Sequence, residues 1–327
     1  LDEMAVAAAA RRFHKEGTNS VAISAVFAPL NDVMEKRAGE IVRNEHPDSS
    51  ITLSSDIGRI GLLERENAGI MNASLATLAM ETVGGFRTAL KKLGVTAPFY
   101  ISQNDGTLMT AEFVAQYPVL TFASGPTNSM RGAAYLSGLE DAIVVDIGGT
   151  TADVGVLSGS FPRESTVSVD IGGVRTNFRM PDILAVGLGG GSEVSEDGAR
   201  VGPRSVGYQL RSRARVFGGD VLTATDIAVA AGYAAIGDAS RVAALPPAVV
   251  ERAVARIHAL ITEAVDRMKT SAAAMPLILV GGGAVLVNRA IPGASEVVVP
   301  EHAGVANAIG ASIAQVGGEI DKVYAYD

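Results

Sequence analysis

The residues best suited to chemistry lie within positions 142–157, where two aspartates flank a turn rich in glycine and threonine. Asp146 and Asp153 enclose four turn residues, Gly148, Gly149, Thr150 and Thr151. Glycine lets backbone N–H groups approach an anion closely, threonine adds hydroxyl donors, and carboxylates can orient a water-coordinated Mg²⁺. The spacing therefore predicts a turn that holds a phosphate and a magnesium ion. The alternative is an ordinary β-hairpin with an aspartate-flanked turn.

The elements around this turn follow an alternation of helical and strand-like patterns that is typical of an α/β protein. The expected helices cover residues 2–15, 31–44, 64–92, 127–139, 225–235, 247–269 and 305–316. The expected strands cover residues 19–27, 51–55, 99–102, 119–122, 143–146 and 277–280, with a β-rich segment from 154 to about 216. Gly84 and Gly85 are expected to interrupt or kink their helix, since each costs about 1 kcal/mol of helix propensity.

Composition narrows the class of protein. The chain has 327 residues, of which 48% are hydrophobic and 19% charged, enough for a large core and about two domains. A net charge of −8 argues against nucleic acid as a general partner. No apolar run is long enough for a transmembrane helix, and the absence of cysteine excludes a disulfide framework and a thiolate metal site. We expect a cytoplasmic enzyme without a membrane partner.

Two further glycine-rich segments are candidates for ligand contact. The first contains Gly189, Gly190, Gly191 and Ser192, whose backbone amides and hydroxyl can approach a phosphate or a substrate carboxylate. It can equally be a flexible crossover between lobes. The second is formed by Gly281, Gly282 and Gly283 after an apolar strand, which suits a backbone lying flat against an adenine. Close packing of strand on helix explains it equally well.

Other polar residues have a structural interpretation beside a functional one. Asp182 and Asp226 can be metal or substrate ligands, or can cap a helix or turn. The arginines of segment 211–215 can grip a carboxylate or phosphate, or can be a solvated loop. The four histidines show no metal-ligand spacing; His14 and His258 lie in charged helical patterns and are expected to face solvent.

The motif Asp146-Ile-Gly-Gly-Thr-Thr-Ala-Asp153 resembles a phosphate loop of the actin-like ATPase superfamily. Further motifs appear in the order seen in the hydantoinase A and 5-oxoprolinase family. They lie at residues 102–109, 124–126, 181–183, 187–192, 201–203, 222–226, 280–283 and 299–300. The resemblance covers nearly the whole chain. It implies an actin-like ATPase (ribonuclease H-like) fold with mixed sheets flanked by helices.

The resemblance also implies an activity: ATP-dependent opening of a cyclic amide or ureide. In such a reaction the γ-phosphoryl group activates the carbonyl oxygen before water attacks. ATP would lie on the turn and on 281–283, and Asp146 and Asp153 would position Mg²⁺ or water.

The domains implied by the resemblance are an α/β segment of an incomplete first lobe, residues 1–95, and a hydantoinase A-type domain, residues 96–327. Relatives carry a preceding domain with its own phosphate loop, which is expected to be absent here because no such loop precedes residue 146.

One residue departs from the family pattern, and this departure favours a second interpretation of the function. Family members often have a histidine where this chain has Leu184. The alternative function is a nucleotide-binding or scaffold subunit of a hetero-oligomeric hydantoinase or ketone carboxylase complex, with a hydantoinase B-like subunit as partner. A homo-oligomer is also compatible with the resemblance. A sugar or acetate kinase of the same superfamily fits the glycine-rich motifs less well.

Overall fold

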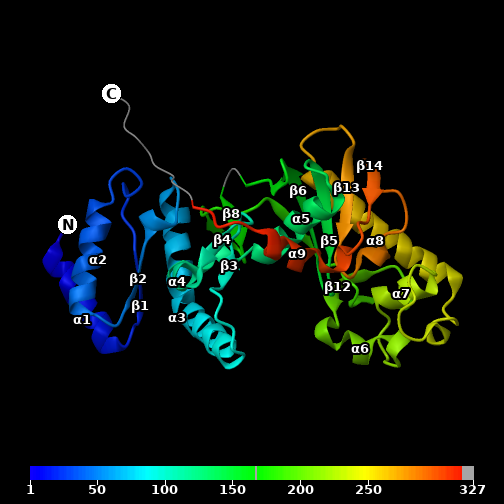
Figure 1. The fold of residues 1–327 in the computed structure, drawn as a ribbon, viewed down its shortest axis with the longest axis horizontal. Helices are drawn as coiled ribbons and strands as arrows, with labels where there is room; N and C mark the ends of the chain where they lie inside the picture. The colour runs from blue at the N-terminus through cyan, green and yellow to red at the C-terminus, as the bar shows by residue number, and fades with distance from the viewer. Residues whose placement is uncertain (166–167, 319–327) are drawn as a thin grey trace. The chain divides into compact units, whose positions relative to one another are not determined.

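The computed structural model describes residues 1–165 and 168–318, which form parts of two compact units (Figure 1). The first unit combines Leu1–Ser124 and Glu164–Met180 with the segment that starts at Gln315. The second unit combines Gly125–Arg163 with Pro181–Ala314. These units do not coincide with the expected division into residues 1–95 and 96–327, which stays a prediction about the domains of the family.

The second unit is built on one mixed β-sheet. Its strands are β5 (Ala142–Ile147), β6 (Ala152–Ser158), β7 (Phe161–Pro162), β10 (Ile183–Val186), β13 (Met275–Val280) and β14 (Ala294–Val298). They follow the order β10-β6-β5-β13-β14, with β7 paired to β6. β5 runs antiparallel to β6 and parallel to β13, so the aspartate-flanked turn joins two neighbouring central strands.

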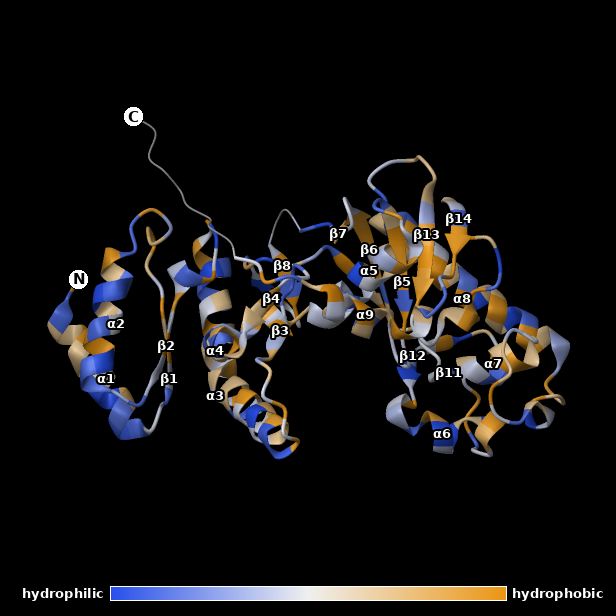
Figure 2. Cartoon of the chain, in the orientation of Figure 1, coloured by the Kyte–Doolittle hydropathy of each residue, from blue (hydrophilic) through white to orange (hydrophobic). Residues whose placement is uncertain are grey.

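Both faces of this sheet are covered by helices. Ile143 and Val145 of β5 belong to the same core cluster as Ile257 of α8 (Pro247–Met268). Val144 packs instead with residues of α5 (Ser124–Ser137) and α9 (Ala306–Ile313). A strand buried on both faces needs apolar side chains in both orientations, which explains the unbroken apolar run before Asp146 and the apolar colour of the strands in Figure 2.

The remaining elements of the second unit lie between β10 and α8 in the sequence. They are β11 (Ser192–Val194), β12 (Val201–Ser205), α6 (Leu210–Arg213) and α7 (Ala224–Ala230). β11 and β12 form a separate antiparallel pair. Helix α7 starts with a reciprocal cap in which the side chains of Thr223 and Asp226 each accept from the backbone N–H of the other.

The first unit contains the other helices and short strand pairs. Its helices are α1 (Glu3–Glu16), α2 (Val33–Glu45), α3 (Leu62–Lys92) and α4 (Ala111–Gln116). Its strands are β1 (Ser20–Ile23), β2 (Ser50–Leu53), β3 (Tyr100–Ser102), β4 (Leu108–Thr110), β8 (Val169–Ile171) and β9 (Val174–Thr176). β1 and β2 pair in parallel, whereas β3–β4 and β8–β9 are antiparallel pairs. Helix α3 packs against β1, β2 and α4.

Two expected elements differ in the structure. The expected strand over residues 119–122 is wrong, because Pro118–Thr121 is a short 3₁₀ helix with proline in its first turn and Val119 fully buried. A short buried apolar run has no period that separates a strand from a helical turn. The expected interruption of α3 is also wrong, since the helix runs continuously through Gly84 and Gly85.

Replacing Gly84 or Gly85 with alanine is expected to stabilise the protein by about 0.5–1 kcal/mol each. A Cβ atom at either position would meet no atom within 4 Å, so the helix gains propensity without a steric cost. Chemical denaturation of each variant measures the change. Gly94→Ala is the matched control, because Gly94 has φ of +71° in open space and alanine there should destabilise. Equal effects at all three positions would contradict this interpretation.

Within the described residues, no helix is both long and apolar enough to cross a membrane.

Candidate functional site

The aspartate-flanked turn forms the tip of the β5–β6 hairpin in the second unit. Asp146 and Asp153 are direct cross-strand partners, so their side chains leave the same face of the hairpin. The turn is closed by a hydrogen bond of 2.9 Å from the Gly148 amide to the Thr151 carbonyl. Gly149, Thr150 and Thr151 are exposed. The predicted phosphate-binding residues thus lie together at an accessible tip.

The two carboxylates repel one another. Burial, and to a smaller extent the neighbouring charge of Asp146, together raise the pKa of Asp153 to about 6. Neither carboxylate has an ion pair with Lys, Arg or His among the described residues. A pair of close carboxylates without a protein cation, beside exposed hydroxyls, fits a hydrated Mg²⁺. No group of three or more His, Cys, Asp or Glu side chains suited to a metal occurs in the described parts of the chain.

The glycine-rich segment at residues 189–192 holds the turn in place through backbone hydrogen bonds, and we call this segment the brace. The amides of Gly190 and Gly191 donate to the carbonyls of Gly148 and Gly149, at 3.0 and 2.7 Å. A Cβ atom on Gly189 would lie 2.5 Å from the Thr150 nitrogen, so glycine is required there by close packing of two backbones.

Ser192 belongs to the same brace. It is fully buried, and its hydroxyl accepts the Gly189 amide at 2.8 Å. All three glycine amides and the Ser192 hydroxyl thus have partners inside the protein. The expected contact of these residues with a phosphate stays a prediction.

The glycine triplet after β13 packs against the base of the hairpin. Gly281 has φ of +85°, and a Cβ atom on it would lie 2.3 Å from Oδ1 of Asp146. The amide of Gly283 donates to the Ile147 carbonyl at 2.7 Å. Gly282 is exposed, and a Cβ atom there would meet nothing within 4 Å. Close packing thus explains Gly281 and Gly283, whereas Gly282 leaves an open stretch of backbone beside Asp146.

Two residues next to the turn were not identified from sequence. Ser205 Oγ lies 3.4 Å from both the Gly149 carbonyl and Thr150 Oγ1. Thr225 donates from its hydroxyl to the Gly190 carbonyl at 2.8 Å, which ties α7 to the brace. Ser205 carries no sequence pattern that would select it in advance, whereas Thr225 lies within the motif at residues 222–226, which does not by itself reveal this contact.

The remaining acidic candidates have structural roles. Asp182 forms an ion pair with Arg163 at 2.6 Å. Asp226 is fully buried, and its carboxylate accepts the amides of Val216 and Thr223, both at 2.7 Å, as well as the Thr223 hydroxyl. Neither aspartate lies on the hairpin.

The other charged candidates also lie away from the turn. In segment 211–215, Arg213 and Arg215 pair with Asp220 and Glu196, as expected for a solvated loop. His258 is buried against the loop after 281–283, contrary to the expectation of a solvent-facing residue, because α8 turns that face toward the core.

Comparison with known proteins gives the family. Residues 65–238 match the family model described as hydantoinase/oxoprolinase, which is more than half of the chain. The chain belongs to the hydantoinase/oxoprolinase family. Residues 1–46 match the model of the family's N-terminal region, so a part of that region is present, whereas the sequence expectation was that the N-terminal domain is absent.

Two curated relatives are similar over most of this chain. The acetophenone carboxylase gamma subunit of Aromatoleum aromaticum is 30% identical over 71% of the chain. The caprolactamase subunit alpha of Pseudomonas jessenii is 29% identical over 72% of the chain. The matched regions cover 33% and 35% of these relatives, so the chain spans about a third of their length.

Solved structures show the same fold. The ATP-dependent caprolactamase of Pseudomonas jessenii matches 97% of this chain with a TM-score of 0.77 and 25% identity, over 51% of its own length. A nucleotide-free acetone carboxylase matches 96% of this chain with a TM-score of 0.70 and 22% identity, over 49% of its length. The mixed α/β architecture is the actin-like ATPase-type fold of this family.

Proposed function

We propose that this chain binds Mg·ATP at the β5–β6 hairpin and serves an ATP-dependent hydrolase that opens a cyclic amide or ureide. The observation that carries the proposal is the cross-strand pair Asp146 and Asp153 beside an exposed Gly-Gly-Thr-Thr turn, in a member of the hydantoinase/oxoprolinase family. The ATP-dependent caprolactamase has the same fold, which supports ATP as the co-substrate. We expect the protein in the cytoplasm, where ATP is available.

In this proposal, different residues of the second unit contact different parts of ATP. The open amides of the turn and the hydroxyls of Thr150 and Thr151 contact phosphate oxygens. The backbone at Gly282 lies against the adenosine part. The brace of Gly189, Gly190, Gly191 and Ser192 holds the turn in place without touching the nucleotide. Asp146 and Asp153 hold Mg²⁺, directly or through water, and the ion neutralises charge on the phosphates.

The proposed reaction overcomes the poor leaving ability of an amide nitrogen. The amide oxygen attacks the γ-phosphorus, the bond to the β,γ-bridging oxygen breaks, and ADP leaves. Water then adds to the activated carbon, the carbon–nitrogen bond breaks, the nitrogen takes up a proton, and inorganic phosphate departs. Positioning and charge neutralisation are the contributions required of the protein.

The two curated relatives support a second candidate function for this chain. Both are subunits of larger proteins, an acetophenone carboxylase and a caprolactamase, and this chain spans about a third of each. On this basis the chain acts as the nucleotide-binding subunit or segment of a hetero-oligomer that includes a hydantoinase B-like subunit. Its reaction would then be the hydrolysis of a cyclic amide or the carboxylation of a ketone.

Phosphate release from Mg·ATP distinguishes these functions. It is measured for the chain alone and with an added hydantoinase B-like subunit, in the presence of hydantoin, caprolactam or 5-oxoproline, or of a ketone with bicarbonate. Release stimulated by a cyclic amide supports the first function. Release stimulated only by ketone and bicarbonate supports the carboxylase alternative. Absence of phosphate release under all these conditions, together with absence of Mg·ATP binding in a calorimetric titration, would contradict both.

A further inference from the structure

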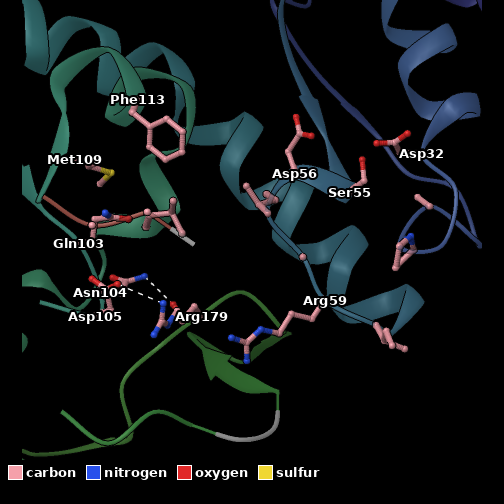
Figure 3. A pocket seen from close by; sticks show the side chains of 18 of the residues that line it. Asp32, Ser55, Asp56, Arg59, Gln103, Asn104, Asp105, Met109, Phe113 and Arg179 are labelled. Carbon is pink, nitrogen blue, oxygen red and sulfur yellow. Dashed lines mark hydrogen bonds and ion pairs between the residues drawn. The ribbon is translucent and has the colours of Figure 1, made fainter. Parts of the chain in front are cut away.

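The first unit contains two groups of polar side chains that the nucleotide site does not use. The first group lines a pocket of about 1170 Å³ and includes Asp32, Ser55, Asp56, Asn104, Asp105 and Arg179 (Figure 3). The carboxylates of this group have partners inside the protein, as in the ion pair of Asp32 with Lys36 at 2.6 Å. The second group is the pair His14 and His46, and imidazole is the commonest metal ligand among side chains.

The two histidines lie at the C-terminal ends of two packed helices. His14 is in the last turn of α1, and His46 is the C-cap residue of α2. The two helices pack against each other and lie side by side in Figure 1. Because the histidines are 32 positions apart, no sequence spacing reveals the pair. A helix C-terminus carries a partial negative charge, so two such ends at one place favour a cation.

The ring of His46 is held in one orientation and one tautomer. His46 is 2% exposed, and its Nε2 lies 2.8 Å from the carbonyl oxygen of Thr18, which can only accept a hydrogen bond. Thr18 is itself fixed, since its amide donates to the Phe13 carbonyl at 3.0 Å. The Nε2 of the neutral ring therefore carries the proton, and Nδ1 presents a lone pair. Metal-binding histidines are commonly oriented by this kind of bond to a backbone carbonyl.

The distances between the two rings fit a shared metal ion. The Nδ1 atoms of His14 and His46 are 3.0 Å apart. Two imidazole nitrogens that bind one ion at about 2.0–2.1 Å are about 2.9 Å apart at a right angle and about 3.3 Å apart in a tetrahedron. The ring centroids are 4.7 Å apart. A linear N–H···N bond between rings that point straight at each other would separate the centroids by about 5.3 Å, so at least one ring is turned off that line.

The surroundings of the pair are compatible with a bound cation. Arg11 of α1 forms an ion pair with Glu45 of α2 at 2.8 Å, which balances its charge. Apart from each other and the Thr18 carbonyl, the two rings have no hydrogen-bond or ion-pair partner in the part of the chain that the structure describes. His14 is exposed, so water can fill the remaining coordination positions of an ion.

We propose that His14 and His46 form a binding site for a divalent transition-metal ion such as Zn²⁺, Ni²⁺ or Cu²⁺, with water as the remaining ligands. Binding replaces the N–H···N hydrogen bond, because the His14 proton moves to Nε2 and both Nδ1 atoms bind the ion. The ion links the ends of α1 and α2 and thereby stabilises the first unit. The site is independent of the proposed Mg²⁺ site at the hairpin, whose oxygen ligands suit a harder ion.

The first test is a calorimetric titration of the 327-residue chain with NiCl₂, in excess Mg²⁺ that occupies carboxylate sites. One Ni²⁺ ion is expected to bind per chain. His14→Ala is expected to lower the affinity about tenfold or more, because one of two protein ligands is lost and alanine is compatible with the helix. His302→Asn is the matched control, since His302 is an exposed histidine and asparagine tolerates its φ of +66°.

The electron paramagnetic resonance spectrum of the Cu²⁺-loaded chain identifies the ligands. Splitting by two nitrogen nuclei is expected in the unmodified chain and in His302→Asn, and splitting by fewer than two in His14→Ala. One equivalent of NiCl₂ is also expected to raise the melting temperature of the unmodified chain, and EDTA to reverse the rise.

Three results would overturn the proposal: no binding of Ni²⁺, equal affinity in His14→Ala, or a Cu²⁺ spectrum without two nitrogen ligands. Each would leave the pair as a hydrogen bond between two rings. A metal-free thermal melt of each variant shows whether the fold is retained, and the spectrum of the unmodified chain tests the site even if His14→Ala does not fold.

Discussion

Replacing Asp146 with alanine is expected to lower the affinity for Mg·ATP by about 10- to 100-fold, the usual cost of removing a residue that orients a metal or its waters. Asp146 lies opposite Asp153 and against Gly281, so its carboxylate is the point at which the hairpin and the glycine triplet meet. The variant removes both the proposed magnesium ligand and that junction. Calorimetric titration with Mg·ATP measures the loss.

Asp266→Ala is the matched control for this experiment. Asp266 is an exposed residue of α8 in the same unit, and alanine is compatible with a helix. Its affinity for Mg·ATP should equal that of the unmodified chain. If Asp146→Ala binds Mg·ATP as tightly as Asp266→Ala does, the hairpin is not the nucleotide site.

Replacing Asp153 with asparagine is expected to stabilise the metal-free protein at neutral pH while weakening Mg·ATP binding. The pKa of Asp153 is raised from 3.8 to about 6 in the folded chain, mainly by burial and then by Asp146. The folded state therefore keeps a proton that the unfolded state has already lost. The free energy of unfolding falls as pH rises from about 4 to about 6 and stays low above that range.

Asparagine carries no charge, so the variant does not lose stability through ionisation of residue 153 as pH rises. With allowance for partial solvent screening, Asp153→Asn should be about 2 kcal/mol more stable than the unmodified chain at pH 8, and the difference should vanish near pH 4. Urea denaturation in chelator at both pH values measures the change. If the variant is less stable than the unmodified chain at pH 8, or if it gains equal stability at both pH values, the pKa of Asp153 is not raised in the folded protein.

The geometry of the hairpin was predictable from sequence because it is local. Asp146 and Asp153 are seven positions apart, and strand pairing through a tight turn brings them together without help from the rest of the chain. The alternating pattern of helices and strands was predictable for the same reason, since Ala142–Ile147 and Pro247–Met268 carry strong apolar patterns.

The brace and other long-range contacts were not predictable, because they join segments that are distant in the sequence. The role of Gly189 is set by the Thr150 backbone, which its own sequence does not reveal. Asp56 and Tyr117 are 61 positions apart and meet only when the loop before α3 packs near α4. The continuity of α3 through Gly84 and Gly85 likewise reflects the packing of the whole helix, which overrides local propensity.

The central claim is that Mg·ATP binds at the tip of the β5–β6 hairpin. Amide hydrogen exchange with and without saturating Mg·ATP tests it most directly, because it reports which segments of the backbone are protected. We expect slower exchange in peptides that cover the turn from Gly148 to Thr151 and the triplet at 281–283. Unchanged exchange in both segments, or protection confined to the first unit, would contradict the claim.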